Sequence, residues 1–120
     1  MKNKYVENYY TELKLEFIEK IKNEIIAFIN SDGGVIYVGV NDEGNPIGIE
    51  TNEKDYIDSK LSSWIRDMFV PNINSYIRYY YNKDDVLEIH IESGREKPYY
   101  LRSKGPTPNG VFIRIGSSTR

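Results

Sequence analysis

Three carboxylates occur where metal chemistry could use them. Glu12 and Glu16 belong to TELKLEF (residues 11–17), and Asp42 follows the apolar segment VIYVGV (residues 35–40). If these segments form neighbouring strands, Glu16 and Asp42 approach one another and offer oxygen ligands to a divalent cation, with Glu12 as a further candidate. The alternative is a solvated charged face beside a turn, and the residue pattern alone favours that alternative.

A second group of candidates lies in the last quarter of the chain. Residues 94–120 carry six Lys and Arg and one acid, whereas residues 1–93 carry 10 Lys and Arg and 17 acids. Cations neutralise phosphates and aromatic rings stack on unpaired bases, which predicts a surface for nucleic acid. The alternative is an ordinary solvated surface with the tyrosines in the core. The predicted nucleic-acid-binding residues are Lys97, Tyr99, Tyr100, Arg102, Lys104, Arg114 and Arg120.

Glycines suggest a third kind of site, a phosphate cradle. Gly33 and Gly34 follow an apolar helical pattern and precede a strand, and no Lys-Ser or Lys-Thr follows them. A P-loop needs the opposite order, strand before helix, so the pair is better explained as the end of a helix. His90 is the only histidine, and no serine or cysteine arrangement accompanies it, which argues against a catalytic triad.

The elements that must position these residues are read from hydrophobic spacing. TELKLEF alternates as a strand, with Leu13, Leu15 and Phe17 on its dry face. A helix follows, with an apolar stripe at Ile21, Ile25, Phe28 and Ile29. The pattern then predicts strands at 35–40 and 47–50 forming a hairpin, a helix at 55–69, and strands at 75–81, 86–92, 98–102 and 111–116.

This order predicts an α+β fold, with a mixed, mostly antiparallel sheet packed against two helices. At 120 residues the chain is expected to form a single domain over 11–120, after a lead-in at 1–10. There is no cysteine, which excludes disulfides and thiolate metal sites. The absence of cysteine also leads us to expect a cytoplasmic protein. No apolar run is long enough to span a bilayer, so we expect no membrane partner.

Several segments together resemble a known family. They are LEF (15–17), IIAFINSDGGVIYVGVNDEGNPIGI (25–49), PNI (71–73), GREKPYYLRSKG (94–105) and VFIRIGSSTR (111–120). Their order and spacing are similar to the Schlafen-type Alba-like domain, the divergent AlbA domain of bacterial transcriptional regulators and Schlafen proteins. The resemblance covers about residues 10–120 and implies DNA binding. It also implies that this chain is the N-terminal part of a longer regulator.

The resemblance further implies a nuclease alternative. Some Schlafen members cleave RNA with two glutamates and an aspartate around a divalent metal. Glu16 and Asp42 match two of these positions, but the first glutamate position is occupied by Thr11, with Glu12 one residue away. A slip of one residue turns a strand side chain to the other face.

Three functions are therefore considered. The first is a DNA- or RNA-binding module that needs no cofactor, and the second is an endoribonuclease dependent on Mg²⁺ or Mn²⁺. The third is a protein-interaction module, for example a homodimer, which the many tyrosines and a free sheet edge would serve. Whether the chain is an enzyme is left open, with the binding module favoured.

Overall fold

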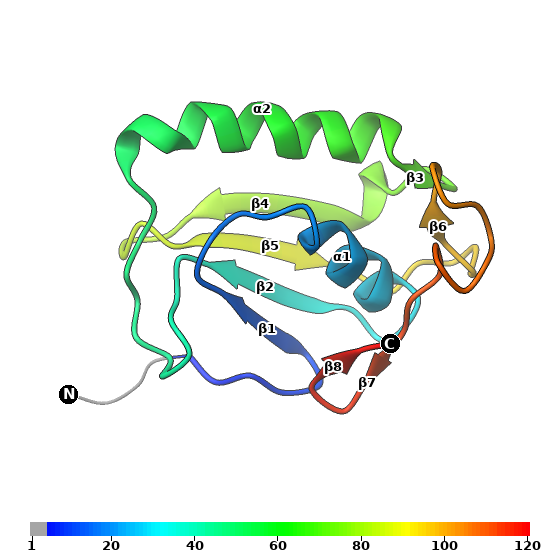
Figure 1. Cartoon of the computed structure of the whole chain (residues 1–120), viewed down its shortest axis with the longest axis horizontal. Coiled ribbons are helices and arrows are strands. Elements are labelled where there is room, and N and C mark those ends of the chain that lie inside the picture. Colours follow the sequence, from blue (N-terminus) through cyan, green and yellow to red (C-terminus); the bar gives the residue numbers. More distant parts are fainter. Residues whose placement is uncertain (1–4) are drawn as a thin grey trace.

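The computed structural model describes residues 5–120 as an α+β domain in which two helices pack on a four-stranded sheet (Figure 1). The strand order is β1 (Thr11–Lys14), β2 (Gly34–Val38), β5 (Leu87–Ile91) and β4 (Ile77–Tyr81). β1 is parallel to β2, and the other two pairs are antiparallel. The predicted fold class is confirmed. Of the predicted lead-in, residues 1–4 lie outside the described residues.

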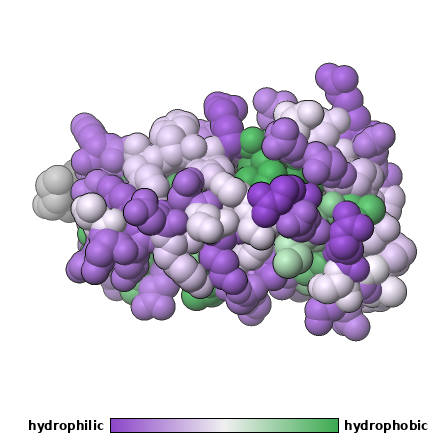
Figure 2. Space-filling model, turned by 90° about the horizontal axis from the view of Figure 1, so that it is seen from above, coloured by the Kyte–Doolittle hydropathy of each residue, from purple (hydrophilic) through white to green (hydrophobic). Residues whose placement is uncertain are grey.

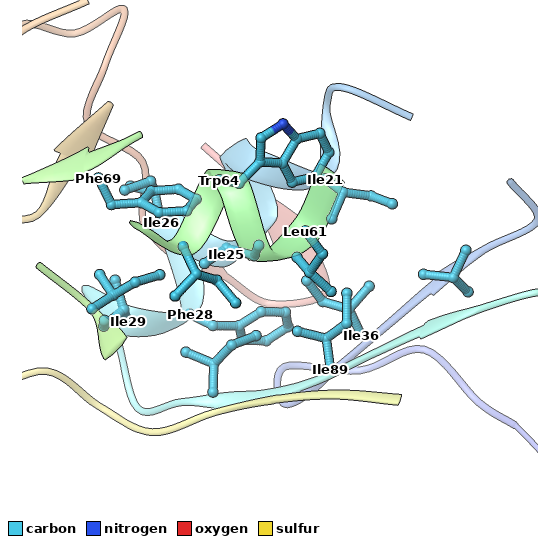
Figure 3. Close-up of a cluster of buried hydrophobic side chains, with 14 of the residues drawn as sticks. Ile21, Ile25, Ile26, Phe28, Ile29, Ile36, Leu61, Trp64, Phe69 and Ile89 are labelled. Carbon is cyan, nitrogen blue, oxygen red and sulfur yellow. The ribbon is translucent and has the colours of Figure 1, made fainter. Parts of the chain in front are cut away.

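α1 (Ile21–Ile29) provides the crossover that a parallel strand pair requires. Its predicted stripe is fully buried, and Ile26 and Ala27 are fully buried as well. Figure 3 shows the reason: α1 side chains contact Ile36 and Ile89 of the sheet, and Leu61 and Trp64 of the second helix lie close by. α1 is therefore the centre of the core.

α2 (Thr51–Asp67) begins at Thr51, earlier than the predicted Asp55. Its buried side chains Ile57, Leu61, Trp64 and Ile65 form the inner face of an amphipathic helix. Phe17, from the segment after β1, stacks on Trp64 with ring centroids 4.7 Å apart. Seen from the α2 side, the molecule is mostly hydrophilic, with hydrophobic colour only in small areas between polar side chains (Figure 2). Neither α1 nor α2 is long and apolar enough to cross a bilayer, and residues 5–120 contain no other α-helix.

The glycine pair ends α1. Gly33 has a φ of +79°, and its N–H donates to the carbonyl oxygen of Phe28 at 2.9 Å. Only glycine adopts this backbone conformation without strain. The chain then enters β2 directly, which confirms the helix-end interpretation of Gly33.

The predicted hairpin at 35–50 is wrong in its second strand. Residues 47–50 form no strand, and the N–H groups of Ile47 and Gly48 both donate to the carbonyl oxygen of Gly39. Gly39 and Gly48 have positive φ values of 105° and 85°, which take the backbone out of the extended region. β2 pairs with β1 and β5 instead.

The predicted strand at 11–17 is shorter than expected and faces the other way. β1 ends at Lys14, Glu12 is buried at 8% exposure, and Leu15 is 50% exposed. An alternating pattern predicts that the apolar residues face the core. In β1 the acidic Glu12 faces the interior instead, because it pairs there with the buried cation of Arg114.

The C-terminal strands do not join the main sheet. Instead of 98–102 and 111–116, the structure has the short strands β6 (Tyr100–Leu101) and β7 (Arg114–Ile115). β6 pairs with β3 (Phe69–Val70), and β7 forms a small hairpin with β8 (Ser118–Thr119). A 3₁₀ turn at Asn74–Tyr76 shortens the predicted strand 75–81 to β4, and the predicted strand 86–92 corresponds closely to β5.

Candidate nucleic-acid interface

Exposed cations gather at one end of the molecule. The segment that carries β6, its flanking loops and the C-terminus lies at the right of Figure 1, away from the turn between β4 and β5. Among residues 5–120, five cations of this segment form no ion pair and are exposed. They are Arg95, Lys97, Arg102, Lys104 and Arg120. A group of cations without counter-ions is suited to bind a polyanion.

Hydrogen bonds hold the side chains of two of these cations in defined positions. The Nε of Arg102 donates to the carbonyl oxygen of Asp67 at the end of α2 (2.9 Å), and its Nη groups carry further donors. The Nζ of Lys97 donates to the hydroxyl of Ser93 at 2.7 Å. Lys104 lies in the loop after β6, where its N–H donates to the carbonyl oxygen of Leu101. The side-chain contacts of Arg102 and Lys97 reduce the side-chain entropy that phosphate binding would cost.

The two predicted aromatic residues have different positions. Tyr100 is half-buried, whereas Tyr99 is fully buried and packs edge-on against Tyr76. The backbone of Tyr99 is fixed by Asn30, whose side chain accepts from its N–H and donates to its carbonyl oxygen. Burial raises the pKa of the Tyr99 phenol above its usual value. Tyr99 is thus a core residue and offers no ring on which a base could stack.

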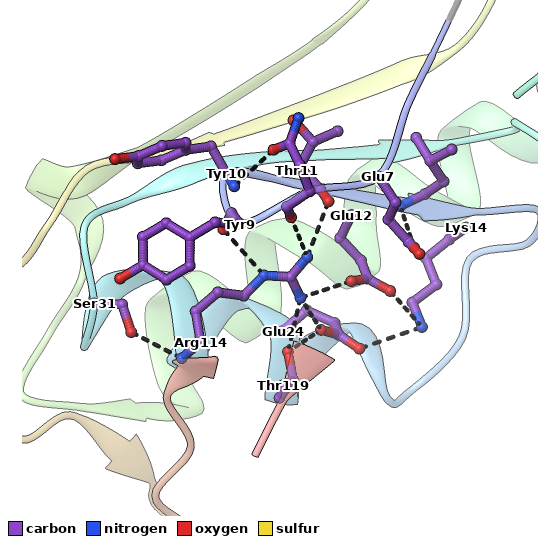
Figure 4. A network of polar contacts seen from close by, with 12 residues as sticks. Glu7, Tyr9, Tyr10, Thr11, Glu12, Lys14, Glu24, Ser31, Arg114 and Thr119 are labelled. Carbon is purple, nitrogen blue, oxygen red and sulfur yellow. Dashed lines mark hydrogen bonds and ion pairs between the residues drawn. The ribbon is translucent and has the colours of Figure 1, made fainter. Parts of the chain in front are cut away.

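Arg114 is also removed from the predicted interface, because its side chain is fully buried. Its guanidinium lies against the ring of Phe28. Every N–H group of the guanidinium donates a hydrogen bond, and Figure 4 shows the network. Nε donates to the carbonyl of Tyr9 and Nη2 to those of Asn8 and Thr11, while Nη1 donates to Glu12 and Thr119. The five donors of an arginine are therefore all used inside the protein.

The cation network around Arg114 explains the orientation of β1. The Nη1 of Arg114 lies 2.7 Å from Glu12 Oε1 and 3.6 Å from Glu24 Oε1. Lys14 Nζ contacts the same two carboxylates, at 3.4 Å and 3.2 Å. Thr119 donates its hydroxyl hydrogen to Glu24. The buried charges of Glu12, Glu24 and Arg114 are thus paired with one another and with the half-buried Lys14, which is how buried charge is tolerated.

Burial and charge oppose one another in the pKa values of this network. Burial, followed by the charge of Glu24, raises the pKa of the Glu12 carboxyl although Arg114 acts to lower it. Burial lowers the pKa of Lys14, but Glu24 and Glu12 outweigh it, so the pKa of Lys14 is raised. Both shifts follow from a closed arrangement of opposite charges in a poorly solvated site.

The carboxylates proposed as a metal site are dispersed. Glu12 is held by Arg114 and Lys14, Glu16 faces a groove beside α2, and Asp42 lines a separate hollow next to Tyr5. Within residues 5–120 no three His, Cys, Asp or Glu side chains gather in a way that could hold a metal ion. The three residues do not fit a divalent cation in this structure. Metal-dependent RNA cleavage therefore stays a prediction, and no cluster of ligands among residues 5–120 supports it.

Arg78 is an exposed cation on the main sheet that was not in the predicted set. Arg78 is on the outer face of β4, directly across from His90 of β5, and it forms no ion pair with the described residues. Tyr80 on the same face stacks on His90, with centroids 5.3 Å apart. The alternation in IRYYY could have indicated that Arg78 and Tyr80 share an outward face.

These features define a small α+β domain with a buried ionic core and a basic end. Residues 7–120 match the family model described as "Schlafen, AlbA_2". The chain belongs to that family, as its motifs predicted.

Two solved structures have a similar fold. One is the N-terminal domain of a protein from Nitrosomonas europaea named as related to the ATP-dependent DNA helicase RecG. The TM-score is 0.58 at 24% identity, covering 93% of this chain and 82% of that one. The other is the DIP2311 protein from Corynebacterium diphtheriae, with a TM-score of 0.58 at 17% identity, covering 93% of this chain and 22% of that one. These likenesses show the fold. No curated protein matches the chain.

Proposed function

We propose that this domain is a nucleic-acid-binding module of a cytoplasmic regulator and that the nucleic acid is DNA. The observation that carries the proposal is the group of exposed cations without ion pairs in residues 95–120. The family match and the helicase-related name of one structural neighbour support it. The regulatory role rests on the family resemblance and the cytoplasmic location on the sequence composition, and both are part of the proposal.

The binding surface proposed here differs from the one expected from sequence. Arg114 and Tyr99 are inside the protein, so among the predicted residues the phosphate contacts fall to Lys97, Arg102, Lys104 and Arg120. Tyr100 is the remaining aromatic candidate for contact with a base. Since the rest of the chain is acidic, we expect the nucleic acid to contact this end alone.

A salt titration tests the proposal quantitatively. Neutralising four phosphates predicts that log K falls with log[salt] at a slope of about −3.6 for duplex DNA. Fluorescence anisotropy with a labelled duplex, between about 50 and 200 mM salt, measures this slope. A flat salt dependence, or no binding at the lowest salt, would refute the proposal.

Matched variants locate the surface. Arg102→Gln/Lys104→Gln removes two phosphate contacts and is expected to reduce the slope to about −1.8. Lys20→Gln/Lys83→Gln removes the same charge from two exposed lysines outside the basic segment and is expected to leave the slope unchanged. An equal loss in both variants would mean that only net charge matters.

A further inference from the structure

A groove with an unusual combination of side chains lies away from the basic end. It has a volume of about 700 Å³ and lies between the segment after β1, residues 47–50 and the first turns of α2. We call it the acidic groove and define it by Leu15, Glu16, Ile47, Glu50, Glu53 and Tyr56.

The apolar side chains of the acidic groove are open to solvent. Leu15 is 50% exposed, and Ile47 and Tyr56 are each 61% exposed. Single exposed apolar residues are common, but several around one hollow are typical of a surface that another molecule covers.

The carboxylates of the acidic groove lack counter-ions. The side chains of Glu16, Glu50 and Glu53 form no ion pair or hydrogen bond with residues 5–120, whereas the neighbouring Asp85 is paired with Lys54 at 2.8 Å. A molecule that covers this groove therefore needs both apolar side chains and cations.

The opposite end of the same chain offers that combination. Arg114 points inward, so its neighbours Ile113 and Ile115 point outward, with exposures of 44% and 52%. Arg120 lies beside them, since its N–H donates to the carbonyl oxygen of Ile113. Lys97 is linked to the same region through Ser93 and Ser31, whose hydroxyl accepts from the N–H of Arg114. We call Ile113, Ile115, Lys97 and Arg120 the hairpin surface.

We propose that the acidic groove of one copy of this chain binds the hairpin surface of a second copy. Apolar contact between the isoleucines and the groove would be accompanied by pairing of Lys97 and Arg120 with the groove carboxylates. In Figure 1 the strand pair β7–β8 and the start of α2 lie at different ends of the domain, so a single copy cannot satisfy both surfaces itself. Contact between two unlike surfaces can extend beyond a pair unless the arrangement closes.

Sedimentation velocity of the 120-residue chain tests this proposal without nucleic acid, so its outcome is independent of the proposed DNA binding. At low salt the average mass is expected to rise with protein concentration from one copy toward two or more. Added salt should reverse the rise, because paired surface charges are screened. A wild-type chain that stays monomeric at the highest concentration would overturn the proposal and leave the groove to another partner.

Charge-reversed variants identify the surfaces. Glu50→Lys/Glu53→Lys and Lys97→Glu/Arg120→Glu change exposed side chains, so both are expected to keep the wild-type circular dichroism and to sediment as monomers. Mixed together, the two variants should associate again, because the wild-type groove of one meets the wild-type hairpin surface of the other. Glu43→Lys/Asp67→Lys reverses exposed carboxylates outside both surfaces and should associate like wild type. Retained association of the reversed variants, or no complex in the mixture, would overturn the proposal.

Discussion

Arg114 and Arg102 belong to the same basic segment of the chain, yet they are placed in opposite ways. Arg102 is exposed, and one of its N–H groups reaches a main-chain carbonyl while the others face solvent. Arg114 is buried, and all its N–H groups are bonded to protein atoms from residues 8–12 and from Thr119. The same residue type thus attaches the C-terminal hairpin to β1 in one place and is available to a ligand in the other.

The comparison shows that local charge density does not separate a binding surface from a structural ion network. The two are distinguished by whether the fold places acidic side chains around the cation. Glu12 and Glu24 are the only acids among the buried residues of the described chain, and both surround Arg114. The exposed cations have no such partners. Substitutions at the two kinds of site should therefore differ in which property they change.

The largest expected effect is on stability, from Arg114→Met. Removing one partner from a buried ion pair leaves an uncompensated charge, which typically costs about 3–5 kcal/mol. We expect a loss of that size in the free energy of unfolding, measured by urea denaturation followed by circular dichroism.

Two further variants sharpen this result. Arg120→Ala, in an exposed position of the same segment, should change stability by less than about 0.5 kcal/mol. Glu12→Leu/Arg114→Met should lose less than Arg114→Met alone, because the carboxylate that would be left unpaired is also removed. A double variant less stable than the single one would show that the main-chain contacts of Arg114, and not its charge, are what matter.

A smaller effect is expected from Asn30, which connects α1 to the basic segment. Its side chain donates to the carbonyl oxygens of Tyr99 and Phe112 and accepts from the N–H of Tyr99. Asn30→Ala leaves the Tyr99 N–H unsatisfied beside a buried ring, so we expect a loss of about 2 kcal/mol. Chemical denaturation measures it, with Asn109→Ala in an exposed loop as the control. Equal stability of the two variants would contradict a role for Asn30 in holding this segment.

Sequence patterns correctly predicted the elements whose conformation is determined by nearby residues. The helical stripe from Ile21 to Ile29, the glycine after it and the alternation of β5 all match the structure, because periodicity and backbone preference determine them. The family was also recognisable, since its motifs occur in order along the chain.

The errors arise where distant residues decide the outcome. Glu12 is buried against Arg114, about a hundred positions later in the chain, and no local pattern records that pairing. The segment 47–50 does not pair with β2 as a strand, because β1 and β5 occupy the two edges of β2. The roles of Tyr99 and Arg114 were misassigned for the same reason. Their residue types suit a surface for nucleic acid, but tertiary contacts place them inside.

The smallest effect concerns the pH dependence that Glu12 confers on the buried network. Burial and the charge of Glu24 raise the pKa of Glu12 above its ordinary value of 4.5, so the folded protein binds this proton more tightly than the unfolded chain does. The resulting stabilisation is fully present below the unfolded pKa and is lost as the pH rises through the folded pKa. Glu12→Gln removes this titration, so the stability of wild type relative to the variant should decline as the pH rises above about 4.5. Urea denaturation of both proteins across that range measures the difference. The opposite result would be a free energy of unfolding that rises with pH in wild type relative to the variant. It would mean that the attraction of Arg114 for the ionised carboxylate outweighs the cost of burying that carboxylate. Arg114 would then differ from the exposed Arg102 mainly by forming a strong ion pair.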